Sequence, residues 1–174
     1  SRGLGDVYKR QAVFGVFVLA GCSEDDLKKT SAVLDSPTVE NDFDRWLTKN
    51  YLEPYNIDFK YRFKDVLGDM DYNLTPADYG QAIKLAKLTL HLTLQVYDEV
   101  TGNRQFISEN FPKIVHVIGS PAYNENNNIV LGVAEGGKMM TLYQVNIIDY
   151  LLETKNIDQL NELFFKTMHH EFGH

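Results

Sequence analysis

A long helix with one apolar side is predicted between Thr75 and Gly102, and it restricts the folds that this chain can adopt. Thr75-Pro76-Ala77-Asp78 places a capping Thr first, a Pro at the first helical position and an acid at the third, and Gly102 would end the helix. The apolar positions recur at helical spacing: Ile83, Ala86, Leu90, Leu94 and Tyr97. A helix this long and this apolar must cover another surface, which we expect to be a β-sheet.

The strands of that sheet are predicted on both sides of the helix. Residues 57–64 alternate between apolar and polar side chains, which is typical of a strand with one buried face. Residues 113–118 read as a second strand, and residues 120–128, with Pro121 and four Asn residues, read as a loop. Residues 129–135 and 139–146 are predicted to form a hairpin, because Gly136-Gly137 between them suits a tight turn.

Two further helices complete the predicted element order. Apolar residues at helical spacing predict a short helix over residues 38–51, and Asp158 is the expected N-cap of a last helix that runs to the end of the chain. A length of 174 residues suits about one domain. The sequence therefore predicts an α+β fold, a single domain over residues 38–174 with a small mixed sheet, a backing helix and a C-terminal helix.

The N-terminal segment is predicted to be an export signal. Residues 12–20 form an uncharged apolar run that is too short to span a bilayer but suits the core of a signal peptide. Leu19-Ala20-Gly21-Cys22 resembles a bacterial lipobox, in which Cys22 becomes the lipidated N-terminus. A short buried strand or helix with a core Cys is the alternative. We interpret residues 1–21 as signal peptide, and residues 1–11 resemble translated sequencing adaptor.

Residues 22–37 are predicted to be a lipidated flexible tether, since they are polar and lack an apolar period. The acidic run Ser23-Glu24-Asp25-Asp26 resembles the surface-export signal of Bacteroidota lipoproteins, although an ordinary solvated linker would look the same. We therefore expect an outer-membrane lipoprotein that is exposed at the cell surface. The formal net charge is −7, so the chain has no excess of positive charge to attract the phosphates of a nucleic acid. This excludes nucleic acid as the main partner.

The last five residues carry the candidate chemistry. His170-Glu171-Phe172-Gly173-His174 is an H-E-x-x-H pattern, and residues four apart on a helix lie on one face, so His170 and His174 can reach a single ion. Zn²⁺ is the metal most often held this way, and Glu171 would be the general base for a zinc-activated water. The alternative is an ordinary histidine pair beside a Glu. His169 is predicted to face solvent or to support the site, and His91 and His116 are not expected to bind metal.

Three segments together resemble a known family. They are the lipobox at Cys22, the Gly132–Lys138 hairpin with Thr141-Leu142-Tyr143 behind it, and Thr167–His174. The sequence resembles the zinc metallopeptidase lipoproteins of Bacteroidota, also described as substrate-import-associated zinc metallohydrolase lipoproteins. The resemblance implies a zincin-like fold, His170 and His174 as zinc ligands, and Glu171 as general base. It also implies a TonB-dependent transporter and its glycan- or peptide-capturing lipoprotein as partners.

The chain ends on the second His, whereas that family continues further. We therefore interpret residues 38–174 as a zincin-like metallohydrolase domain truncated at its C-terminus, without its third ligand and inactive alone. Two functions remain open. The first is a zinc-dependent metallohydrolase, a peptidase with a peptide or other hydrolysable substrate, anchored in the membrane by the lipid on Cys22. The alternative is a non-catalytic surface lipoprotein that binds nutrients or assists a TonB-dependent transporter.

Overall fold

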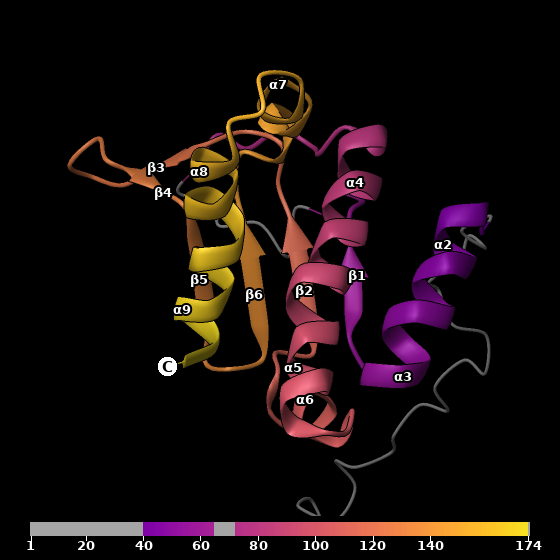
Figure 1. The fold of residues 1–174 in the computed structure, drawn as a ribbon. Coiled ribbons are helices and arrows are strands. Elements are labelled where there is room, and N and C mark those ends of the chain that lie inside the picture. The colour runs from indigo at the N-terminus through magenta and orange to yellow at the C-terminus, as the bar shows by residue number, and fades with distance from the viewer. Residues whose placement is uncertain (1–39, 65–71, 174) are drawn as a thin grey trace, which may run out of the picture. The chain divides into compact units, whose positions relative to one another are not determined.

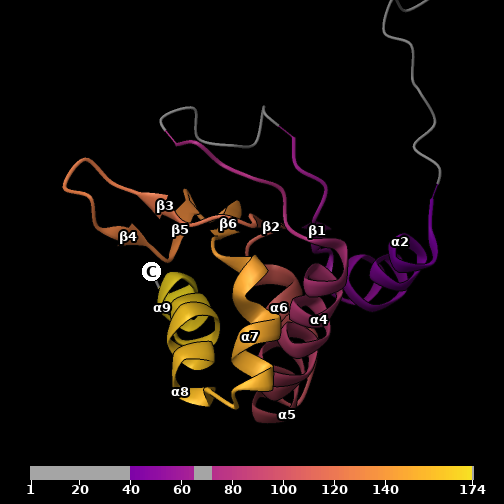
Figure 2. The same ribbon diagram turned by 90° about the horizontal axis from the view of Figure 1, so that it is seen from above.

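The structure is a computed structural model that describes residues 40–64 and 72–173. The chain divides into two compact units, Ser1–Val39 and Glu40–His174, and every described residue belongs to the second unit. Within that unit the helices lie on one side of a small mixed sheet (Figures 1 and 2). The predicted α+β class is confirmed. The predictions for residues 1–37, including Cys22, and for His174 fall outside the described residues.

The main sheet has four strands in the order β1-β2-β6-β5. β1 (Asp58–Lys60), β2 (Ile114–Val117) and β6 (Met139–Leu142) run parallel, and β5 (Gly132–Glu135) is the antiparallel edge strand beside β6. Gly136 and Gly137 join β5 to β6 with φ angles of 55° and 71°, so the predicted hairpin is present. It is shorter than predicted, because Ile129–Val130 pairs in a different sheet and β6 ends at Leu142. β1 is much shorter than predicted, because pairing with β2 ends at Lys60.

The two faces of the sheet have different neighbours. Val115, Val117, Met140 and Leu142 point into the main hydrophobic core under the helices. The residues between them point to the other face, where Ile118 and Tyr143 form a second, smaller cluster with Phe63, Tyr72 and Leu74 among its neighbours. This alternation follows from the period of two along a strand. The sheet is therefore covered on both faces, by helices on one and by loop segments on the other.

The long helix is present, but it begins later than predicted. It runs through α4 (Tyr79–Thr89), the π-helical turn η3 (Leu90–Leu94) and α5 (Gln95–Thr101), and Gly102 ends it with a φ of 75°. Its N-cap is Asp78, whose carboxylate accepts a hydrogen bond from the amide of Gln81. The expected cap at Thr75 is wrong, because Pro76 is extended and bridges to Ile118 at the end of β2.

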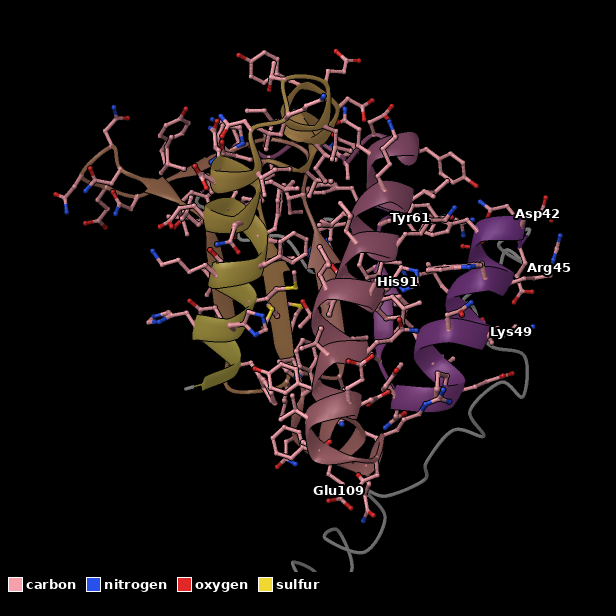
Figure 3. All side chains as sticks on the ribbon, in the orientation of Figure 1. Asp42, Arg45, Lys49, Tyr61, His91 and Glu109 are labelled. Atoms are coloured by element: carbon pink, nitrogen blue, oxygen red, sulfur yellow. The ribbon has the colours of Figure 1, made fainter. Side chains whose placement is uncertain are left out.

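The first predicted helix also begins later, at a capping box. The side chain of Asn41 accepts a hydrogen bond from the amide of Asp44, whose carboxylate accepts one from the amide of Asn41. Tyr61 donates a hydrogen bond to Asp44 across 2.7 Å, which ties the residues after β1 to this helix. Figure 3 shows Tyr61 close to the N-terminal end of α2. The helical run comprises α2 (Asp42–Leu47), the π-helical turn η1 (Thr48–Leu52) and α3 (Glu53–Tyr55).

Several short elements escaped prediction. The predicted loop contains β3 (Ala122–Tyr123), which pairs with β4 (Ile129–Val130) in a separate two-stranded sheet. The 3₁₀ turn η4 (Val145–Ile147) and α7 (Ile148–Glu153) precede the last helical run. α6 (Gln105–Asn110) precedes β2, where the sequence predicts a short helical or irregular piece that ends near Pro112. The last run comprises α8 (Ile157–Leu160), the π-helical turn η5 (Asn161–Lys166) and α9 (Thr167–Gly173). Its N-cap is Asn156, not Asp158.

Among residues 40–64 and 72–173, every helix falls short of the length and apolar character that a membrane span requires.

Candidate active site

Helix α9 carries His170 and Glu171 and is held beside the sheet by an aromatic cluster. The ring of Phe172 lies 4.9 Å from that of Phe111 and 5.3 Å from that of Tyr97. Met168, one turn earlier, is fully buried. An apolar stripe runs along the last helical run, and its first three members are buried while Phe172 is half-buried: Leu160, Phe164, Met168 and Phe172. The stripe fixes which side of α9 faces outward.

Glu171 meets the edge strand of the sheet. Its Oε2 atom accepts a hydrogen bond from the backbone amide of Ala134 in β5 across 3.1 Å. Figures 1 and 2 show α9 lying alongside β5. The bond joins residues far apart in the sequence and holds the carboxylate at the rim of the sheet.

The outward groups of β5 follow from its register with β6. The amide of Tyr143 donates to the carbonyl of Leu131, and Val133 lies opposite Thr141. Directly opposed residues in an antiparallel pair alternate between hydrogen-bonded and non-hydrogen-bonded positions. Leu131 and Val133 occupy hydrogen-bonded positions, so the backbone groups of Gly132 and Ala134 point away from β6. Gly132 and Ala134 therefore present their N–H and C=O groups along the edge that Glu171 contacts.

Two hollows meet at Glu171. The first has a volume of about 310 Å³ and is lined by the start of β5 and by the last helical run: Leu131, Gly132, Glu162, Lys166, Thr167, His170 and Glu171. The second, of about 560 Å³, lies towards the end of β5: Tyr97, Phe106, Asn110, Pro112, Gly137, Glu171, Phe172 and Gly173. Since the hollows reach the two ends of β5 and share Glu171, the carboxylate sits midway along the edge strand.

Of the two predicted zinc ligands, His170 lies among the described residues. His170 is exposed on α9 and lines the first hollow together with Glu171. Neutral imidazole is a preferred zinc ligand, so the side chain of His170 is of a suitable type and lies in the hollow beside Glu171. Within the part of the chain that the structure describes, no group of three His, Cys, Asp or Glu side chains lies close enough to hold an ion. His174, the second predicted ligand, falls outside the described residues.

The other histidines lie elsewhere. His169 is exposed, as predicted, and its Nδ1 atom lies 3.0 Å from the hydroxyl of Tyr97. His91 lies on the long helix (Figure 3) and is exposed. Its Nδ1 atom lies 2.7 Å from Oε1 of Gln95. His116 is buried in β2, and burial lowers its pKa. In the described part of the chain neither His91 nor His116 belongs to a group of three potential metal ligands.

The sequence interpretation missed the partner of Glu171. The H-E-x-x-H spacing indicates which side chains share a helix face, but the donor to Glu171 is a backbone amide of β5. Every residue except proline carries a backbone amide, so residue identity does not show which amide will donate. The available signal was the predicted hairpin itself, whose edge strand must expose alternate backbone groups.

Comparisons with known proteins identify the family of this chain. A family described as "Putative zinc-binding metallo-peptidase" matches residues 36–174. A solved structure described as a "putative zinc-binding metallo-peptidase" from Bacteroides caccae matches with 43% identity and a TM-score of 0.57, over 75% of this chain and 48% of that one. The chain thus spans about half the length of that relative. Among curated proteins there is no match. The family match covers the whole described unit, so the chain belongs to this family of zinc-binding metallo-peptidases.

Proposed function

We propose that this protein is a zinc-dependent metallohydrolase that cleaves peptides, with Glu171 as the general base. The observation that carries the proposal is the hydrogen bond from the Ala134 amide to Glu171, which holds a carboxylate at the open edge of β5. His170 lines the same hollow. Hydrolysis of an extended peptide needs a metal ligand, a base for the attacking water and a strand edge that binds the peptide. His170, Glu171 and β5 would supply these three parts.

His170 and His174 would hold the zinc ion, together with a third ligand from outside the described residues. When bound, zinc supplies a Lewis acid that polarises the scissile carbonyl and makes a nearby water more acidic. Glu171 takes the proton of the attacking water and passes it to the leaving amine. The amide of Ala134 orients the carboxylate for that transfer, because its hydrogen bond fixes one of the two oxygens.

The substrate would bind as an added strand. Gly132 and Ala134 direct backbone groups away from β6, and Glu171 occupies only the amide of Ala134. An extended peptide can therefore pair with the remaining outward groups, the amide of Gly132 and the carbonyls of Gly132 and Ala134, as a fifth strand of the sheet. The two hollows at the ends of β5 would receive side chains on either side of the scissile bond. Edge-strand pairing reads backbone rather than sequence, which suits a peptidase of broad specificity.

We further propose a zincin-like subdomain and an envelope location for the whole protein. The sheet with its open edge strand beside α9 supports the first. The lipobox ending at Cys22 supports lipid anchoring at the outer membrane, with exposure at the cell surface. A TonB-dependent transporter and its capture lipoprotein are the partners proposed on the same basis.

Replacing Glu171 with Gln in the full-length protein tests the function. The amide keeps the size of the side chain but cannot accept the proton, so we expect turnover of a peptide substrate to fall about a hundredfold to ten-thousandfold. Zinc content, measured by atomic absorption, should stay at the parental level because Glu171 is not a ligand. Glu153→Gln, an exposed position on α7, is the matched control and should keep parental turnover.

Two results would contradict the proposal. Parental turnover in Glu171→Gln would remove Glu171 from the chemistry. A zinc-loaded parent that binds peptides or glycans without cleaving them would favour the alternative, a non-catalytic surface lipoprotein that captures nutrients for a transporter.

A further inference from the structure

Gly132, in the edge strand, lies against helix α9 with no room for a side chain. A Cβ atom built on Gly132 would lie 2.7 Å from the Cγ2 methyl of Thr167 and 3.1 Å from the backbone oxygen of Thr141. Real Cβ atoms are not found as close as 2.7 Å to a side-chain carbon, so any other residue would force the strand and the helix apart. The φ angle of Gly132 is not in the left-handed region. Space, and not backbone conformation, therefore explains a glycine here.

Thr167 cannot easily move out of the way. It is buried, with 8% of its surface exposed, and its Oγ1 donates a hydrogen bond to the carbonyl of Glu162 across 3.0 Å. Met168 beside it is fully buried in the main core. The methyl of Thr167 is thus held towards β5 by contacts on its other sides.

The same two elements meet again near the proposed base. Ala134 is two residues beyond Gly132 on β5, and Glu171 is four residues beyond Thr167 on α9. The first contact is a close approach of backbone to methyl, and the second is the hydrogen bond from Ala134 to Glu171. Because a helix turn and a strand are both stiff, the spacing at the first contact sets the spacing at the second.

We propose that Gly132 is a positioning residue for Glu171: the absence of its side chain lets α9 approach β5 closely enough for the Ala134 amide to hold the carboxylate. Gly132 touches neither the carboxylate nor the scissile bond and acts through the methyl of Thr167. The proposal rests on the proposed function for its catalytic part. Its geometric part, the dependence of the Ala134–Glu171 bond on Gly132, stands without it.

The test measures geometry and turnover separately in the full-length protein. In Gly132→Ala, the Ala134 amide should lose its acceptor, and its hydrogen exchange measured by NMR should become about tenfold faster, the factor expected for one hydrogen bond. The kcat for a peptide substrate should fall about a hundredfold, the cost of a displacement near 1 Å. KM should change little, because the outward backbone groups of β5 remain in place.

A second variant distinguishes positioning from simple damage. Thr167→Ser removes the methyl that the new Cβ would meet and keeps the hydroxyl that bonds to Glu162. The double variant Gly132→Ala/Thr167→Ser should therefore regain most of the Ala134 protection and most of kcat. Gly80→Ala on α4 is the matched glycine control, and we expect it to leave both readouts at the parental values.

The outcomes separate the two hypotheses. Gly132→Ala with parental exchange at Ala134 and parental kcat would overturn the proposal. A loss of folding, or a loss of protection at the Ala134 amide, that Thr167→Ser does not restore would also overturn it. Such a result would mean that the new Cβ is limited by the backbone oxygen of Thr141 and not by the methyl of Thr167. If the zinc-loaded parent shows no turnover but the exchange rates change and recover as expected, the proposed function fails while the positioning role of Gly132 stands.

Discussion

His116 is a polar residue in the middle of a buried strand. It lies on the face of β2 that points away from the helices, opposite Thr141 of β6 and Lys60 of β1. Both ring nitrogens of His116 and the hydroxyl of Thr141 are buried without a hydrogen-bond partner among the described residues. Burial without a partner disfavours the charged ring, and this lowers the pKa of His116 below the ordinary 6.5. The imidazole is therefore buried in its neutral form.

This state predicts a pH dependence of stability. Above pH 6.5 His116 is neutral in both states, but below it the unfolded chain takes up a proton that the folded chain resists. The free energy of unfolding should fall as the pH drops from 6.5 towards the folded-state pKa. The ammonium of Lys60 on the neighbouring strand, ion-paired with Asp58, does not help the folded state accept the proton. Urea titrations across this range measure the slope.

His116→Leu should flatten that slope, because an apolar side chain fills the site without titrating. His91→Gln, at an exposed position of the long helix, is the control and should leave the slope as it is in the parent. A parental slope in His116→Leu would show that another group controls stability in this range.

Residue patterns predict His170 and Glu171 as site residues, but they do not point to Gly132 or Ala134. The H-E-x-x-H spacing works because a helix has one fixed period, so two side chains can be placed on one face from sequence alone. The contribution of Gly132 depends on a methyl group 35 positions later in the chain, and that of Ala134 is a backbone group. Contacts of this kind depend on the packing of two elements, which no local pattern encodes.

At the scale of elements, the start of the long helix depends on Asn146. Its side-chain oxygen accepts a hydrogen bond from the amide of Asp78 across 2.6 Å, and its side-chain amide donates to the carbonyl of Pro76 across 3.2 Å. The amide of Gly119 donates to the carbonyl of Thr75. These bonds keep the residues before Asp78 extended against the end of β2, which is why Thr75 does not cap the helix.

Asn146→Ala should lower the free energy of unfolding by about 1–3 kcal/mol, since it leaves the Asp78 amide and the Pro76 carbonyl without these partners. Asn146→Asp keeps an acceptor for Asp78 but loses the donor to Pro76, so its cost should be intermediate. Chemical denaturation followed by circular dichroism measures both. Equal stability of Asn146→Ala and the parent would mean that water replaces both bonds without loss.

At the scale of the whole molecule, the class of fold could be predicted and the details of its elements could not. Long periodic segments, such as the helix ending at Gly102 and the hairpin around Gly136-Gly137, were predicted in type because their patterns are local, although their bounds differ from the prediction. The short elements β3 and α7 were missed, since two to six residues carry too little periodicity. The strand order was not predicted, because parallel pairing of β1 with β2 joins segments separated by the entire long helix.

That separation has a consequence for how the chain folds. β5 and β6 are neighbours in sequence and can pair within microseconds, whereas β1 can join only after the long helix has closed back onto the sheet. In pulse-labelled exchange during refolding, the Tyr143 amide, bonded to Leu131, should be protected before the Asp58 amide, bonded to Lys113. Simultaneous protection of the two amides would contradict this order. When the complete chain refolds, therefore, the main-sheet strand that lies earliest among the described residues is the last to find its partner.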